Sequence, residues 1–76
     1  MKVHKKNIER SSWAMAALVT FQRVTGLSDD DGLDTAISDL LADIMHLCDV
    51  NGFEFDSDLL RIARGHYEWE KDHPND

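Results

Sequence analysis

Apolar residues recur at intervals of three and four along most of this chain, which is the spacing of one face of an α-helix. Alternation of apolar and polar residues, typical of strands, is nearly absent, and the chain has a single proline. Gly26 in "VTGL" and Gly52 in "DVNGF" stand where many helices end on a left-handed residue. The pattern predicts a small all-α domain with frayed ends and three helices, near residues 8–25, 31–51 and 57–71.

Acidic and hydroxyl residues mark the starts of the second and third predicted helices. Ser28 and Asp31 have the spacing of a capping box, although Asp30 or Asp31 alone is an equally good N-cap. Asp56 is the candidate N-cap of the third helix, and Asp58 suits the positive end of its dipole. These residues indicate where both helices begin but leave the first residue of the second helix open.

The second predicted helix divides most clearly into an apolar and a polar side. On a helical wheel of about 100° per residue, its apolar residues cluster within about 80° of Ile37; they are Leu33, Leu40, Leu41, Ile44, Leu47 and Cys48. Asp39, Asp43 and His46 lie on the opposite side, at a spacing of i, i+4 and i+7 that a metal site could use. Carboxylates turned away from the core are easily hydrated, and a metal ion there needs a further ligand from elsewhere. We therefore interpret them as a solvated face with no metal site, and Cys48 as a small core residue.

The first predicted helix is apolar almost all the way round. A helix without a polar face is buried on several sides, and a three-helix domain can hardly enclose one alone. We therefore expect this helix to be the central element, with Trp13, Ala16 and Val19 in a homodimer contact. The alternative is simple exposure of Trp13 and Val19, which small proteins tolerate. In the third helix, four residues are expected to face inward: Leu59, Leu60, Ala63 and Tyr67.

The length of 76 residues and the single cysteine limit how this domain is stabilised. A domain of this size buries only about 60% of the surface that its unfolded chain exposes, so its core is marginal. An internal disulfide and a zinc-ligand spacing are both missing from the sequence, which leaves self-association or a partner subunit as the expected support. The basic start "MKVHKKNIER" precedes an apolar run too short to span a bilayer. We expect a cytoplasmic protein with no membrane contact.

Charge is distributed unevenly along the chain, whose formal net charge is −7. Residues 1–23 carry five Lys or Arg and one Glu, whereas residues 24–60 carry ten Asp or Glu and no Lys or Arg. The middle of the chain therefore projects a negative potential, which disfavours direct DNA binding. The alternative explanation is that these charges serve solubility alone.

The negative charge of this acidic segment favours binding to a protein that normally binds nucleic acid. Carboxylates four residues apart on a helix lie about 6 Å apart at Cβ, similar to phosphates along one strand. We therefore predict an acidic face that binds a basic nucleic-acid-binding host protein, and we name it by its residues: Asp30, Asp31, Asp34, Asp39, Asp43 and Asp49.

The known catalytic and cofactor motifs do not match this chain. The stretch "DVNGFEFDSDLL" hints at a calcium loop, but its glycine is fourth instead of sixth and its twelfth residue is Leu60. The acids of "EWEKD" lack the ExxE spacing of helical nucleotide pyrophosphohydrolases, and no glycine-rich phosphate loop occurs. We predict no catalytic residues, no cofactor and no enzyme activity.

Residues 32–70 combine three short patterns, A-x-x-DLLAD-x-MH, a Gly-x-x-Phe break and a final HYE. With them the chain resembles a group of small uncharacterised acidic helical proteins encoded by phages, prophages and plasmids. The resemblance covers about half of the chain and implies an origin in a mobile element. Phage genes of this size and acidity often encode inhibitors of host defence, including anti-CRISPR proteins.

Three functions remain open at this point. The leading hypothesis is a non-enzymatic protein-binding inhibitor from a phage or mobile element, which competes with nucleic acid as a DNA mimic. The second is a structural or accessory protein, such as a homodimeric subunit or an antitoxin-like partner. The third is a small metal-dependent enzyme.

Overall fold

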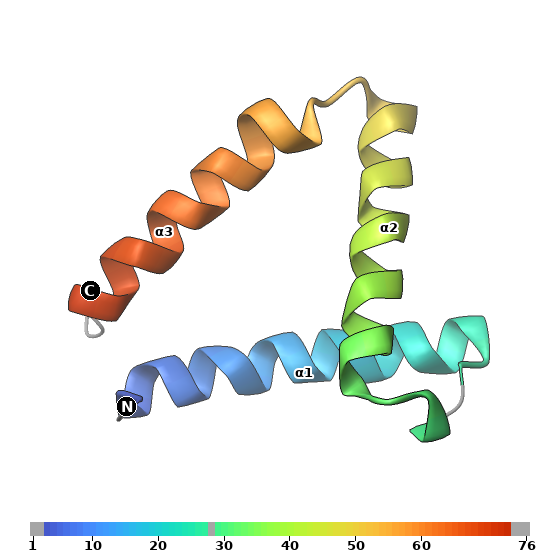
Figure 1. Ribbon diagram of the computed structural model, residues 1–76, viewed down its shortest axis with the longest axis horizontal. Helices are drawn as coiled ribbons and strands as arrows, with labels where there is room; N and C mark the ends of the chain where they lie inside the picture. The colour runs from blue at the N-terminus through green and yellow to red at the C-terminus, as the bar shows by residue number, and fades with distance from the viewer. Residues whose placement is uncertain (1–2, 28, 74–76) are drawn as a thin grey trace.

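Three α-helices make up the computed structural model in Figure 1, which describes residues 3–27 and 29–73. They are α1 (Lys5–Thr25), α2 (Leu33–Asn51) and α3 (Leu60–Asp72). A 3-10 turn, η1 (Asp29–Asp31), precedes α2, and a π-helical turn, η2 (Phe55–Leu59), leads into α3. The described ranges contain no strand, so the predicted all-α fold is confirmed. The ends predicted to be frayed, residues 1–2 and 74–76, lie outside the described residues.

Two glycines end the first two helices, as the sequence predicts. Gly26 has φ 73°, and its N–H donates to the carbonyl oxygen of Gln22 at 2.9 Å. Gly52 also has φ 73°, and the N–H of Phe53 donates to the carbonyl oxygen of Cys48 at 2.9 Å. This left-handed geometry satisfies carbonyl groups that the helix leaves without partners, and glycine adopts it without a steric penalty.

The starts of α2 and α3 differ from the predicted ones. The N-cap residue of α2 is Gly32, whose φ of 90° breaks the helix away from the preceding Asp residues. Neither Asp30 nor Asp31 therefore caps α2, and Ser28 lies outside the described residues. Asp56 does not cap α3, because the turn around it is π-helical and begins after Glu54, which makes no side-chain cap bond.

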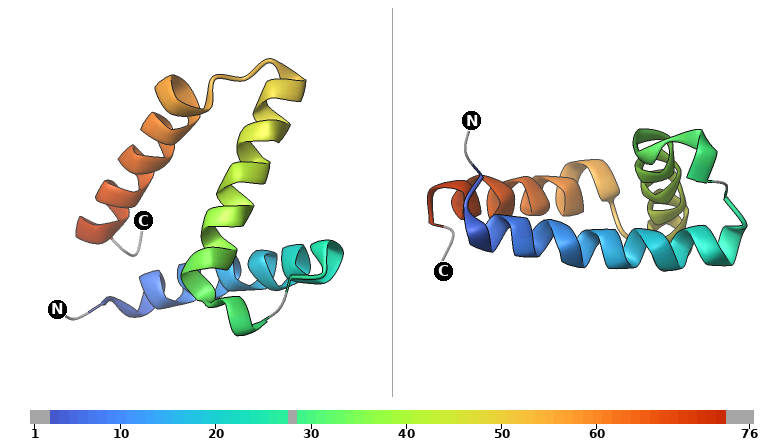
Figure 2. Two further views of the ribbon diagram at one scale, coloured as in Figure 1. Left: turned by 45° about the vertical axis from the view of Figure 1, so that its right-hand side comes forward. Right: turned by 90° about the horizontal axis from the view of Figure 1, so that it is seen from below.

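The three helices form the sides of a triangle (Figure 1). The first turns of α2 cross α1, and α3 runs back from the far end of α2 until its last turn lies beside the first turn of α1. Seen from the edge the molecule is flat (Figure 2), with extents of 35 × 32 × 17 Å. Its radius of gyration is 14.1 Å, compared with about 11 Å for a compact domain of this length. The single chain is therefore flat and not globular.

The core of the single chain is very small. Among the described residues, the buried hydrophobic ones are Leu18 on α1 and Ala36 and Cys48 on α2, each 3% exposed. Cys48 is therefore a core residue, as its place in the apolar stripe predicts. Helix α3 has no buried residue at all.

Two predictions about packing are wrong for the single chain. The sequence predicts α1 as the central element, but α1 forms one side of the triangle and buries only Leu18. The predicted inward side of α3 is not covered either, because Leu59, Leu60, Ala63 and Tyr67 are all exposed. The physical reason is the triangular arrangement, in which α2 meets α1 with its first turns and α3 meets α1 with its last turn.

Candidate functional site

The acidic face predicted from the sequence extends over η1 and the whole length of α2. Its six residues follow one another from η1 to the last turn of α2: Asp30, Asp31, Asp34, Asp39, Asp43 and Asp49. All are exposed except Asp39, which is half-buried. On the helical wheel Asp39 and Asp43 lie about 40° apart, whereas Asp34 lies about 140° from Asp39. The acids thus surround much of α2, and only Asp39 and Asp43 share one narrow side.

Lys and Arg residues do not neutralise α2. Residues 24–60 contain none, and within the ranges 3–27 and 29–73 no ion pair involves an Asp of α2. The ion pairs that the structure shows lie elsewhere, Lys6 with Glu9 at 3.6 Å and Arg10 with Glu70 at 3.2 Å. Like charges four residues apart destabilise a helix by about 0.2–0.5 kcal/mol. A basic partner would relieve that repulsion on α2.

The side of α2 with Asp39 and Asp43 also carries His46, which is exposed. Over the part of the chain that the structure describes, no three His, Cys, Asp or Glu residues form a group that could hold a metal ion. The three side chains extend from successive turns of one helix, and within residues 3–27 and 29–73 no other element completes a group of metal ligands with them. This side of α2 therefore carries two carboxylates and an imidazole, of which Asp43 and His46 are exposed.

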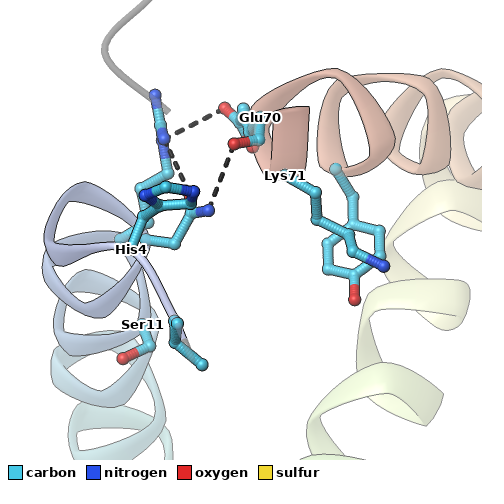
Figure 3. Close-up of a pocket in the computed structure, with 8 residues that line it drawn as sticks. His4, Ser11, Glu70 and Lys71 are labelled. Carbon is cyan, nitrogen blue, oxygen red and sulfur yellow. Dashed lines mark hydrogen bonds and ion pairs between the residues drawn. The ribbon is translucent and has the colours of Figure 1, made fainter. Parts of the chain in front are cut away.

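A contact between the first turns of α1 and the last turn of α3 closes the triangle (Figure 3). The Nε atom of Arg10 lies 3.2 Å from Oε2 of Glu70, and Nδ2 of Asn7 donates to the carbonyl oxygen of Glu70 at 3.1 Å. A second Arg10 nitrogen, Nη1, donates to Oδ1 of Asn7 at 2.7 Å. These bonds hold the end of α3 beside α1, at the edge of a cleft of about 640 Å³ that Tyr67 and Lys71 also line.

This contact is the feature that the sequence analysis missed. Asn7 and Glu70 are 63 residues apart, and each belongs to a residue type that is common on helix surfaces. Their pairing depends on the angle at which α3 returns toward α1, which the helical spacing does not specify. The opposite charges of Arg10 and Glu70 are consistent with a pairing but do not select it among the many charges of the chain.

The predicted homodimer contact on α1 lies away from the buried Leu18 of the same helix. Trp13 is 56% exposed, Ala16 is also exposed, and Val19 is half-buried. These residues lie about 100–160° from the buried Leu18 on the helical wheel. The Nζ atom of Lys6 lies 5.2 Å from the centre of the Trp13 ring, which is a cation–π distance. The contact itself stays a prediction.

Comparison of the chain with protein-family models, with curated proteins and with solved structures gives no match. Among the described residues, no helix combines the length and the apolar character that crossing a membrane requires.

Proposed function

We propose that this protein is a non-enzymatic inhibitor that binds a basic nucleic-acid-binding protein of a host cell. The side of α2 with Asp39 and Asp43 takes the place of nucleic acid on that protein. The observation that carries the proposal is the pair Asp39 and Asp43, on a helix whose segment, residues 24–60, contains no Lys or Arg. The resemblance to proteins of phages and plasmids supports a defence protein as the partner, and anti-CRISPR inhibition is the specific form proposed.

Charge neutralisation explains how a short helix can compete with DNA or RNA. Nucleic-acid-binding grooves obtain much of their affinity from Lys and Arg that neutralise phosphates. Carboxylates on successive helical turns lie about 6 Å apart at Cβ and meet such a groove with a comparable density of negative charge. Because complementary charges also steer the approach of two proteins, association is expected to be fast and to slow as salt is added.

A competition assay tests the proposal once affinity capture has named a partner. The purified partner is mixed with fluorescently labelled DNA or guide RNA, and this protein is added until the nucleic acid is displaced. The double variant Asp39→Lys with Asp43→Lys is expected to need about tenfold more protein or higher for the same displacement, because each change reverses a charge facing the groove. The matched control is Glu68→Lys with Asp72→Lys on α3, which changes the net charge equally.

The outcomes distinguish a specific binding site on α2 from an effect of the overall net charge. Loss of displacement in the α2 variant alone, with a helical circular dichroism spectrum retained, supports the proposal. Equal loss in both variants would show that overall charge matters and that α2 is not the site. If the partner binds nucleic acid equally well with this protein attached, competition is not the mechanism.

The structure also favours a second candidate, a homodimeric accessory or antitoxin-like protein. The observation in its favour is the extent of apolar surface, since Trp13, Leu41, Tyr67 and Trp69 are all exposed in the single chain. An accessory protein of this kind is expected to bind its partner without displacing nucleic acid. The competition assay therefore distinguishes it from the inhibitor.

A further inference from the structure

Helices α2 and α3 each carry an apolar side that is uncovered in the single chain. Ile37, Leu41 and Met45 lie on the helical wheel within about 60° of the buried Cys48, yet they are 44%, 44% and 41% exposed. On α3, Leu60 and Tyr67 lie within about 20° of one another, and both are exposed. We call these five residues the apolar face.

The exposure is also large in total. The accessible surface of the chain is 6253 Å², whereas a compact monomer of 8.7 kDa has about 4,700 Å². The excess is about 1,500 Å² for each chain, or about 3,000 Å² for two chains, within the range of obligate homodimers. The chain thus exposes more surface than a compact monomer of its mass, and a dimer contact of the usual size would remove an area of this order.

Helix α3 itself requires a cover. It has 13 residues and no buried residue, and an isolated helix of about 12–15 residues is marginal in water because most helical stability comes from packing. A partner that binds only at times would leave α3 without support when it dissociates. A second copy of the chain is present wherever the first one is, so it supplies the cover permanently.

The shape of the chain also fits a second copy as the partner that covers the apolar face. The chain extends 35 × 32 Å across but only 17 Å in thickness, so a second copy packed against it gives a more compact particle than the single chain. Twofold symmetry lets each copy offer the same face to the other, which is the commonest arrangement of soluble dimers. Asp39 and Asp43 both lie about 160° from Leu41 on α2, so this contact leaves them outside.

We propose that this protein is a homodimer in which the apolar face of each copy covers the apolar face of the other. This contact differs from the α1 contact around Trp13 predicted from the sequence. It does not depend on the inhibitor function, because Asp39 and Asp43, the pair that carries that function, lie on the other side of α2 from the apolar face, whereas Asp34 lies beside it.

Light scattering after size-exclusion chromatography tests the proposal directly. The wild-type chain is expected to elute with about twice the mass of 8.7 kDa at low micromolar concentration. Leu41→Glu places a charge in the apolar face and is expected to weaken the dimer by about 100-fold or more. The matched control is Val50→Glu on the same helix, at a residue that is 84% exposed and outside the apolar face, and this variant is expected to remain dimeric.

Hydrogen exchange keeps the test informative if Leu41→Glu fails to fold. In the wild-type protein, the amides of α3 are expected to be protected at high concentration and to exchange faster on dilution, as the dimer dissociates. A wild-type monomer at about 100 µM would overturn the proposal. So would a dimer that Trp13→Glu dissociates and Leu41→Glu leaves intact, since the contact would then lie on α1.

Discussion

Gly52 and Gly65 both have open space around them, yet replacing each with alanine is expected to change the free energy of unfolding in opposite directions. A Cβ atom added to Gly52 or to Gly65 meets nothing within 4 Å. The backbone differs, because Gly52 has φ +73° whereas Gly65 lies inside α3 and is not among the glycines with positive φ. Gly52→Ala and Gly65→Ala therefore isolate the effect of backbone conformation from that of packing.

The magnitudes follow from the two conformations. Alanine in a left-handed conformation costs about 1–2 kcal/mol, so Gly52→Ala is expected to lower the free energy of unfolding by that amount. Alanine inside a helix is favoured over glycine by about 1 kcal/mol, so Gly65→Ala is expected to raise it. For a chain of this length, 1 kcal/mol corresponds to a shift in Tm of about 4–8 °C.

Thermal unfolding followed by circular dichroism measures both shifts. All samples need one fixed protein concentration, because the Tm of a dimer depends on concentration. If Gly52→Ala leaves Tm unchanged, α2 does not end on a left-handed residue. If Gly65→Ala lowers Tm, its Cβ meets atoms from outside the single chain, and a second copy contacts the side of α3 opposite the apolar face.

The remaining predictions concern the core and the contact between α1 and α3. Leu18→Ala is expected to lower the free energy of unfolding by about 2–5 kcal/mol in urea denaturation, because the side chain is buried; Val24→Ala, at an exposed residue of the same helix, is the control. Arg10→Ala removes the ion pair with Glu70 and is expected to cost about 0.5–1 kcal/mol, since both side chains are partly exposed. A double-mutant cycle with Glu70→Ala that shows no coupling would mean that this contact does not hold α3 in solution.

Local structure is what the sequence by itself determined. Helical spacing of apolar residues identifies α1, α2 and α3 because 3.6 residues per turn place every third or fourth side chain on one face. Gly26 and Gly52 mark the ends of two helices because a left-handed φ is cheap for glycine alone. The place of the acids along α2, and of Cys48 within its apolar stripe, follows from the same periodicity. The starts were missed because the positive φ of Gly32 and the π-helical turn after Glu54 are decided by the path of the chain between helices.

Only the tertiary structure decided how the helices are oriented relative to one another and which apolar residues they bury. The spacing marks Ile37, Leu41 and Cys48 equally as core residues, yet Cys48 alone among them is buried. The contact of Asn7 with Glu70 joins residues 63 positions apart. Such contacts depend on the angles at which the helices meet, and those angles are set by packing between distant segments. Periodicity describes which side of a helix is apolar but not whether its own chain or a second copy covers it.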